Sequence, residues 1–168
     1  MKLQVCGYTR ESVVDGPGIR AVVFAQGCPH HCQGCHNPDT WNFEEGYELD
    51  GDQILEQIKN TRSLRGVTFS GGEPFSQARA FASLAESVKS LGLDIMTYTG
   101  YSYEDLLAMS ENDNGVKTLL HNTDILVDGS FKEEEKDYSL AFRGSRNQRI
   151  INVPASLSSE SIVLMQFD

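Results

Sequence analysis

The sequence predicts an α/β fold in which parallel strands alternate with helices. Residues 21–25, Ala-Val-Val-Phe-Ala, form a continuous apolar run, as expected for a strand buried on both faces of a parallel sheet. Further along, short strand-like segments are each followed by apolar residues at helical spacing. At 168 residues the chain is long enough to bury one core, so we expect a single domain spanning residues 1–168.

The elements are expected in the following order. Residues 1–6 form a first strand, in which Cys6 is expected to be a buried apolar residue. Residues 13–20 hold two glycines and a proline behind an aspartate, which indicates a tight turn. Asp52 is the candidate N-terminal cap of the first helix, and Trp41 is expected to pack over the loop before it. Further strands are expected at 65–70, 93–98, 123–129, 150–153 and 161–165, and helices at 51–60, 76–91 and 103–109.

Charge and hydropathy narrow the class of partner. The formal net charge of −10 argues against nucleic acid or an anionic membrane, so a protein or a small molecule remains. No apolar run approaches the length of a membrane span, and the first residues resemble a strand rather than a signal peptide. We therefore expect a cytoplasmic protein, whose thiols stay reduced.

Three cysteines lie close together in the loop after the apolar run. Cys28, Cys32 and Cys35 have the spacing Cys-x3-Cys-x2-Cys, so one loop can bring all three to one metal centre. Soft thiolates select zinc, copper(I) or an iron–sulfur cluster, and a [4Fe–4S] cluster ordinarily takes four cysteines. Three cysteines would leave one iron open to a small ligand, which distinguishes a catalytic cluster from an electron carrier.

A structural zinc site is the main alternative. His30, His31 or His36 could complete a mixed thiolate and imidazole set. Structural zinc sites usually draw their ligands from two separated pairs, however, and the only later histidine is His121. A disulfide framework is less favoured still, because four cysteines in 168 residues are few.

A pair of glycines ends the predicted strand at 65–70. Gly71 and Gly72 expose backbone groups that a ligand can approach without a Cβ in the way, although two glycines are also compatible with a simple tight turn. The cysteine loop follows the carboxyl end of the strand at 21–25, where ligands bind in open α/β sheets, and this location supports a catalytic cluster.

Together these motifs resemble a known superfamily. The cysteine spacing resembles that of the radical S-adenosylmethionine (SAM) enzymes, and residues 71–74, Gly-Gly-Glu-Pro, resemble the motif whose backbone holds the SAM amino group. With residues 15–20, 26–28 and 34–41, they resemble the activating enzymes of glycyl-radical enzymes. The resemblance implies a partial, open (β/α) barrel of the radical SAM type, with about five or six β–α units.

Two subfamilies share this front half. One activates pyruvate formate-lyase, and the other activates the anaerobic, class III ribonucleoside-triphosphate reductase. Residues 98–101, 126–131 and 142–149 resemble the reductase activators, and the chain is shorter than the lyase activators. The reductase subfamily is therefore favoured, with activation of another glycyl-radical enzyme or a small-molecule substrate as alternatives. A non-catalytic zinc or iron–sulfur module is a further alternative.

The resemblance also implies roles for individual residues. Cys28, Cys32 and Cys35 would hold one [4Fe–4S] cluster per chain, whose open iron chelates SAM. Residues expected to bind SAM, partly through their backbone, are Gly34, Cys35, His36, Gly71, Gly72 and Glu73, with Asp128 and the arginine-rich segment 143–149 as second-tier candidates. Gly34 stands where the superfamily commonly has an aromatic residue near the adenine. No side-chain acid or base is assigned, because the chemistry belongs to the cofactors.

The implied partners are proteins. They are the large subunit of the anaerobic reductase, whose glycine would receive the radical, and a flavodoxin or ferredoxin as electron donor. The sequence leaves open whether the chain forms a homodimer.

Overall fold

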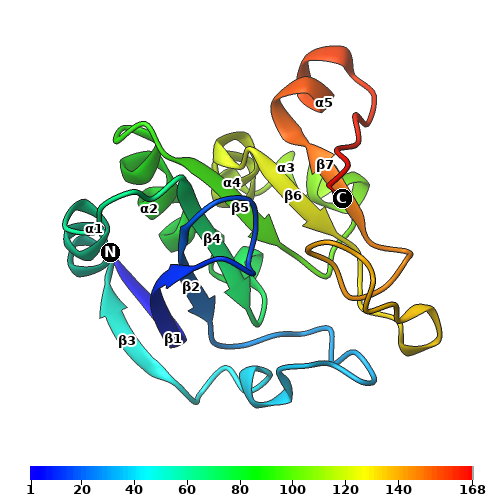
Figure 1. The fold of residues 1–168 in the computed structure, drawn as a ribbon, viewed down its shortest axis with the longest axis horizontal. Coiled ribbons are helices and arrows are strands. Elements are labelled where there is room, and N and C mark those ends of the chain that lie inside the picture. Colours follow the sequence, from blue (N-terminus) through cyan, green and yellow to red (C-terminus); the bar gives the residue numbers. More distant parts are fainter. Residues whose placement is uncertain (168) are drawn as a thin grey trace.

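The computed structural model describes residues 1–167 as a seven-stranded mixed sheet with helices packed on it (Figure 1). The strands lie in the order β3-β1-β2-β4-β5-β6-β7. Their bounds are β1 Lys2–Ser12, β2 Arg20–Ala25, β3 Tyr47–Asp50, β4 Gly66–Gly71, β5 Asp94–Tyr98, β6 Ile125–Asp128 and β7 Arg149–Asn152. The helices are α1 Gly51–Lys59, α2 Ala78–Lys89, α3 Tyr103–Ser110, α4 Asn114–Asn122 and α5 Val153–Ser159. Short 3-10 turns are η1 Pro38–Thr40, η2 Pro74–Gln77 and η3 Glu133–Glu135.

The centre of the sheet is parallel, which confirms the predicted α/β class. β2, β4, β5 and β6 pair in parallel, whereas β1, β3 and β7 pair antiparallel at the two edges. β3 and β7 lie at opposite ends of the strand order, so the sheet is open. Crossovers through α1, α2 and the pair α3 and α4 join the parallel strands. This makes fewer β–α units than the five or six expected, because the chain enters and leaves the sheet through antiparallel strands.

The helices cover one face of the sheet, and loops cover the other. On the helical face, buried strand residues such as Val23 and Phe69 pack against α1, α2, α3 and α4, with Phe69 and Phe81 in edge-to-face contact at 4.9 Å between centroids. On the opposite face, Met96 and Val127 lie under residues of the long β6–β7 loop and of the last described segment. The two faces of the sheet are therefore covered by different kinds of structure. No helix within residues 1–167 combines the length and apolarity that crossing a bilayer requires.

Several local expectations were wrong. Cys6 is exposed, because the alternation along β1 turns Val5 into the core and Cys6 outward. The cap of α1 is Asp50, whose Oδ1 accepts a hydrogen bond from the N–H of Asp52 at 2.9 Å. Residues 161–165 do not form a strand; a single antiparallel bridge joins Leu164 to Ile151. Strand β3 and helices α4 and α5 were not predicted.

A buried arginine secures the loop between β1 and β2. Arg20 has 0% exposed surface and forms an ion pair with Asp94. Its Nε donates to Thr68 Oγ1 at 2.7 Å, and its Nη1 donates to the carbonyl oxygen of Pro17 at 3.0 Å. A buried guanidinium is tolerated only when its donors are satisfied in this way. Arg20 therefore ties the loop to β4 and β5.

Replacing this arginine should destabilise the whole domain. Arg20→Ala leaves Asp94 and Thr68 without their buried partner, so we expect the free energy of unfolding to fall by about 3–5 kcal/mol. Urea unfolding of the metal-free protein at pH 7 measures the change. Arg65→Ala is the matched control: Arg65 contacts the same carboxylate at 3.5 Å from an exposed position, and its loss should cost less than about 1 kcal/mol. Equal losses in the two variants would contradict the role of the buried pair.

Candidate functional site

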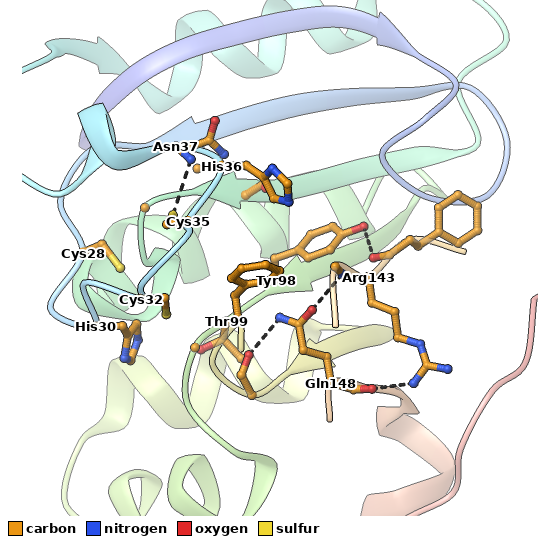
Figure 2. A pocket seen from close by; sticks show the side chains of 18 of the residues that line it. Cys28, His30, Cys32, Cys35, His36, Asn37, Tyr98, Thr99, Arg143 and Gln148 are labelled. Carbon is orange, nitrogen blue, oxygen red and sulfur yellow. Dashed lines mark hydrogen bonds between the residues drawn. The ribbon is translucent and has the colours of Figure 1, made fainter. Parts of the chain in front are cut away.

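A cavity of about 440 Å³ opens at the carboxyl ends of the parallel strands. Its walls come from the loops that follow β2, β4, β5 and β6, which is the edge where parallel sheets bind ligands. Figure 2 shows the cysteine loop on one side of this cavity and the side chains of Tyr98, Arg143 and Gln148 on the other. The residues that line it include Cys28, His30, Cys32, Cys35, His36, Gly71, Gly72, Thr99, Gly100 and Phe131.

All three clustered cysteines line the cavity. They lie in an irregular loop in which the Cys35 N–H donates to the Cys32 carbonyl oxygen at 3.1 Å, and the Cys28 N–H donates to the Trp41 carbonyl oxygen at 3.1 Å. The Trp41 ring stacks on His31, 4.7 Å between centroids, so the tryptophan packs over the loop as expected. The loop has neither helix nor strand to stiffen it.

The donor set suits an iron–sulfur cluster with an open iron. Three soft thiols share one wall of the cavity, and the remaining cysteine, Cys6, lies exposed on β1. Within residues 1–167, however, no three His, Cys, Asp or Glu side chains are close enough together to hold a metal ion. A [4Fe–4S] cluster binds each thiolate to a different iron, so its three ligands do not have to meet at a single ion.

The Cys28 thiol must lose its proton to bind a metal, and its surroundings affect how readily it does so. Burial raises the pKa of Cys28, while the backbone N–H groups of His30 and His31 act in the opposite direction by donating to its sulfur. A metal ion favours the thiolate and shifts the balance towards it.

The two glycines of the β4–η2 turn lie against the strand that leads into the cysteine loop. The Gly72 N–H donates to the Ala25 carbonyl oxygen at 2.8 Å. Gly71 has a φ of +92°, and a Cβ there would lie 2.6 Å from the Ala25 nitrogen. A Cβ on Gly72 would collide with the backbone carbonyl of Gly27. Both glycines line the cavity, and the close backbone approach explains why neither position accommodates a side chain.

Glu73 is placed differently from the predicted SAM contact. Its side chain has 0% exposed surface and does not line the cavity. The carboxylate accepts hydrogen bonds from Thr99 Oγ1 at 2.9 Å, from the Gly100 N–H at 2.8 Å and from the Phe75 N–H at 3.1 Å. His30 Nε2 lies 2.6 Å from the same carboxylate. The side chain is thus directed beneath the cavity wall.

Gly34 and His36 lie on the side of the cysteine loop that faces the β6–β7 loop. Gly34 has a φ of +77°, and a Cβ there would collide with the Glu133 carboxylate and approach Phe131. Gly34 does not line the cavity, whereas His36 does. The His36 and Phe131 rings lie 5.3 Å apart between centroids, so Phe131 is an aromatic side chain of the site that the sequence did not single out.

Asp128 and two of the three arginines of segment 143–149 do not line the cavity. Asp128 is buried, accepts from the Tyr103 N–H at 2.8 Å and pairs with Arg149 at 2.6 Å. Hydrogen bonds to Asp128 and Glu104 raise the pKa of Arg149 above its usual range. Of the three arginines only Arg143 lines the cavity, where its Nη1 donates to the Gln148 carbonyl oxygen at 2.5 Å.

Residues at the end of β5 also line the cavity. The sequence predicted this segment only as the end of a strand. Tyr98 lines the cavity, and its hydroxyl donates to the Phe142 carbonyl oxygen at 2.6 Å. Burial, with the nearby Asp15 carboxylate, raises the pKa of Tyr98 well above its ordinary value. Tyr98 therefore stays protonated and ties the β6–β7 loop to the sheet. The sequence feature that could have identified Tyr98 as a cavity residue is its position at the carboxyl end of a predicted strand.

Comparison with known proteins defines the class. The family described as "4Fe-4S single cluster domain" matches residues 14–151, a span that contains the cysteine loop and every parallel strand. The chain belongs to this class of iron–sulfur proteins.

Similar proteins then define the family within that class. The chain is 40% identical over 147 residues to a Vibrio cholerae protein and 36% identical over 149 residues to an Escherichia coli K12 protein, both named anaerobic ribonucleoside-triphosphate reductase-activating protein. These alignments cover 82% and 84% of this chain and 90% and 93% of the relatives. The chain belongs to the family of anaerobic ribonucleoside-triphosphate reductase-activating proteins.

More limited similarity extends to two other proteins. The pyruvate formate-lyase-activating enzyme of Clostridium pasteurianum is 42% identical over 104 residues, which cover 56% of this chain and 44% of that protein. Among solved structures, QueE from Escherichia coli aligns with 61% of this chain and 54% of its own, at 18% identity and a TM-score of 0.48.

The tight contact at Gly71 gives a testable consequence. Gly71→Ala must adopt a positive φ and also press against the Ala25 backbone, so we expect a loss of about 3 kcal/mol in the free energy of unfolding. Gly92→Ala is the matched control, because Gly92 has a φ of +82° but nothing within 4 Å of its added Cβ, and it should cost about 1 kcal/mol. Urea unfolding of both variants measures the difference, and indistinguishable midpoints would show that backbone contact at the turn is unimportant.

Proposed function

We propose that this chain is a radical SAM activating enzyme that generates a glycyl radical on anaerobic ribonucleoside-triphosphate reductase. The observation that carries the proposal is that three cysteines and a Gly-Gly turn meet in one open cavity. A [4Fe–4S] cluster bound there would supply one electron, cleaving SAM to methionine and a 5′-deoxyadenosyl radical, which removes a hydrogen atom from a glycine Cα and becomes 5′-deoxyadenosine.

The residues of the chain bind, orient and shield. Cys28, Cys32 and Cys35 would hold the cluster through their thiolates, and Gly71 and Gly72 would leave room for SAM beside it. His36 and Phe131 offer ring surfaces to the adenosine part. Because the cavity must hold an aggressive radical, its main task is positioning and exclusion of water.

The reductase is favoured over pyruvate formate-lyase as the partner. The relatives named as reductase activators align over 90% or more of their own length, whereas the lyase activator aligns over 44% of its length. The chain thus has the extent of the reductase activators. The lyase remains the second candidate, because 42% identity over 104 residues is high within the shared region.

The same proposal also implies an electron donor and a cellular compartment. A flavodoxin or ferredoxin supplies the electron, and the cytoplasm supplies the reducing conditions that free thiols and an oxygen-sensitive cluster need. The net charge of −10 supports a protein partner rather than nucleic acid.

The mouth of the cavity supports a protein substrate. The three most exposed large apolar side chains of residues 1–167 are Tyr138 at 82%, Val14 at 75% and Val13 at 70%. Tyr138 and Val14 line the cavity from two different loops, and Val13 is the neighbour of Val14. Apolar side chains left exposed around an opening mark contact with another protein. We assign this rim to the glycine-bearing segment of the reductase.

Replacing the cluster ligands tests the chemistry. Cys28→Ala, Cys32→Ala and Cys35→Ala should each abolish formation of 5′-deoxyadenosine, because a cluster held by two thiolates is not retained. Cys6→Ala, at an exposed position on β1, should reconstitute normally and serves as the control. Iron and acid-labile sulfide analysis, electron paramagnetic resonance with and without SAM, and the 5′-deoxyadenosine assay are the measurements. Tightly bound zinc without sulfide, and no response to SAM, would overturn the proposal in favour of a structural zinc site.

Replacing the rim residues tests docking of the reductase separately from cleavage of SAM. Tyr138→Asp and Val14→Asp should lower glycyl radical formation on the reductase at least about tenfold, since a charge on an apolar contact has to be desolvated on docking. Cleavage of SAM by the enzyme alone should stay near the wild-type rate. Leu91→Asp, on an exposed site at the far end of α2, is the control and should leave both activities unchanged. Wild-type activation by both rim variants would contradict the assignment of the rim.

A further inference from the structure

The carboxylate of Glu73 lies at the junction of three segments that carry the site. It belongs to the Gly-Gly turn after β4, it accepts from Thr99 and Gly100 at the end of β5, and it reaches His30 in the cysteine loop. It has 0% exposed surface. A charge this deeply buried is stable only if the surrounding donors satisfy it.

Those donors occupy the carboxylate. Oε1 accepts from the Gly100 N–H at 2.8 Å and from Thr99 Oγ1 at 2.9 Å. Oε2 accepts from the Phe75 N–H at 3.1 Å and from the same hydroxyl at 3.0 Å. Since Oε1 is an acceptor, His30 Nε2, at 2.6 Å, carries the hydrogen and donates. Little capacity remains for a ligand amino group.

Two further contacts restrain the His30 ring. Its ring packs edge-on against Tyr101, 4.6 Å between centroids. The ring also lies where a Cβ on Gly100 would be, so only glycine at position 100 leaves room for it. His30 is in turn two residues after Cys28, so a contact that fixes His30 also restrains the backbone beside this cysteine.

We propose that Glu73 is a positioning residue for the cysteine loop, fixing His30 and, through it, the backbone beside Cys28. The inference deepens the proposed function and rests on it for the identity of the cluster. Outer groups that orient metal ligands tune the metal centre. Glu73 would therefore influence the reduction potential of a bound cluster, and it links the cysteine loop to the Gly-Gly turn.

Matched substitutions test the contact between His30 and Glu73. His30→Gln keeps an N–H donor within reach of Glu73, whereas His30→Phe keeps a ring but has no donor. His31→Phe is the control in the same loop, because His31 stacks on Trp41 and a phenyl ring can stack there too. Glu73→Gln turns an amide NH₂ towards groups that are themselves donors. Far-UV circular dichroism establishes that each variant is folded, and the two His30 variants decide the question if Glu73→Gln is not.

The first measurement needs no cluster. Amide hydrogen exchange of residues 28–36 in the metal-free protein should be about tenfold faster in His30→Phe and Glu73→Gln, as expected for loss of one charge-assisted hydrogen bond that restrains the loop. His30→Gln and His31→Phe should exchange at nearly the wild-type rate. Acceleration in His31→Phe equal to that in His30→Phe would show a general disturbance of the loop and overturn the proposal.

The second measurement is the midpoint potential of the reconstituted cluster, with iron and sulfide content as the check of assembly. His30→Phe and Glu73→Gln should shift it in the same direction, the double variant should shift it no further, and His30→Gln should restore it. Additive shifts, or an unchanged potential in all variants, would contradict the proposal. If Glu73→Gln alone loses the SAM-induced change in the spectrum, Glu73 acts on SAM directly and the inference fails.

A different result would contradict the proposed function itself. A wild-type protein that holds a cluster but shows no response to SAM would contradict the proposed function. The exchange rates and potentials of the variants would still decide the role of Glu73.

Discussion

The site depends on backbone pairing that continues past the ends of two parallel strands. The Gly72 N–H donates to the Ala25 carbonyl oxygen and the Glu73 N–H donates to the Gly27 carbonyl oxygen, each at 2.8 Å. These bonds extend the register of β2 and β4 into the loops, so the Gly-Gly turn lies directly against the start of the cysteine loop. Only glycine permits so close an approach, because a Cβ at position 71 or 72 would meet backbone atoms.

Beyond that pairing, the cysteine loop is held by a few polar contacts rather than by a core. The Gln26 side chain donates to the carbonyl oxygens of Asp39 at 3.0 Å and Asn42 at 2.7 Å, which closes the base of the loop. Glu73 holds its middle through His30, and Trp41 covers it by stacking on His31. A segment with few buried apolar contacts opens at low free energy. Such a loop can rearrange to wrap a cluster, and binding then supplies the order that packing does not.

The open sheet and the loops above it suit the proposed function, in which a radical is transferred to another protein. Antiparallel strands end the sheet on both sides, so the cavity is walled by loops on its outer face instead of by further β–α units. The buried Arg20 and the Tyr98 hydroxyl fasten those loops to the central strands. The walls are therefore firm close to the sheet, while exposed apolar side chains gather at the mouth. This combination suits a macromolecular substrate that must reach the cavity and then seal it.

Local chemistry by itself determined the parallel core and the central motifs of this protein. Largely apolar runs located the central strands, because a strand buried on both faces is mostly apolar. The cysteine spacing and the Gly-Gly turn identified two walls of the cavity, since ligands gather at carboxyl strand ends. The edge strand β3 and helix α5 escaped prediction, because short amphipathic segments take their conformation from the partners they meet.

Only the tertiary structure decided where individual polar groups point. Glu73 belongs to the predicted motif, yet its carboxylate turns away from the cavity to donors on β5 and the cysteine loop. Asp128 and Arg149, both among the second-tier candidates, pair with each other. Cys6 faces outward because of the register of β1. Sequence periodicity indicates which side chains are buried, but partners distant along the chain determine how a buried charge is satisfied.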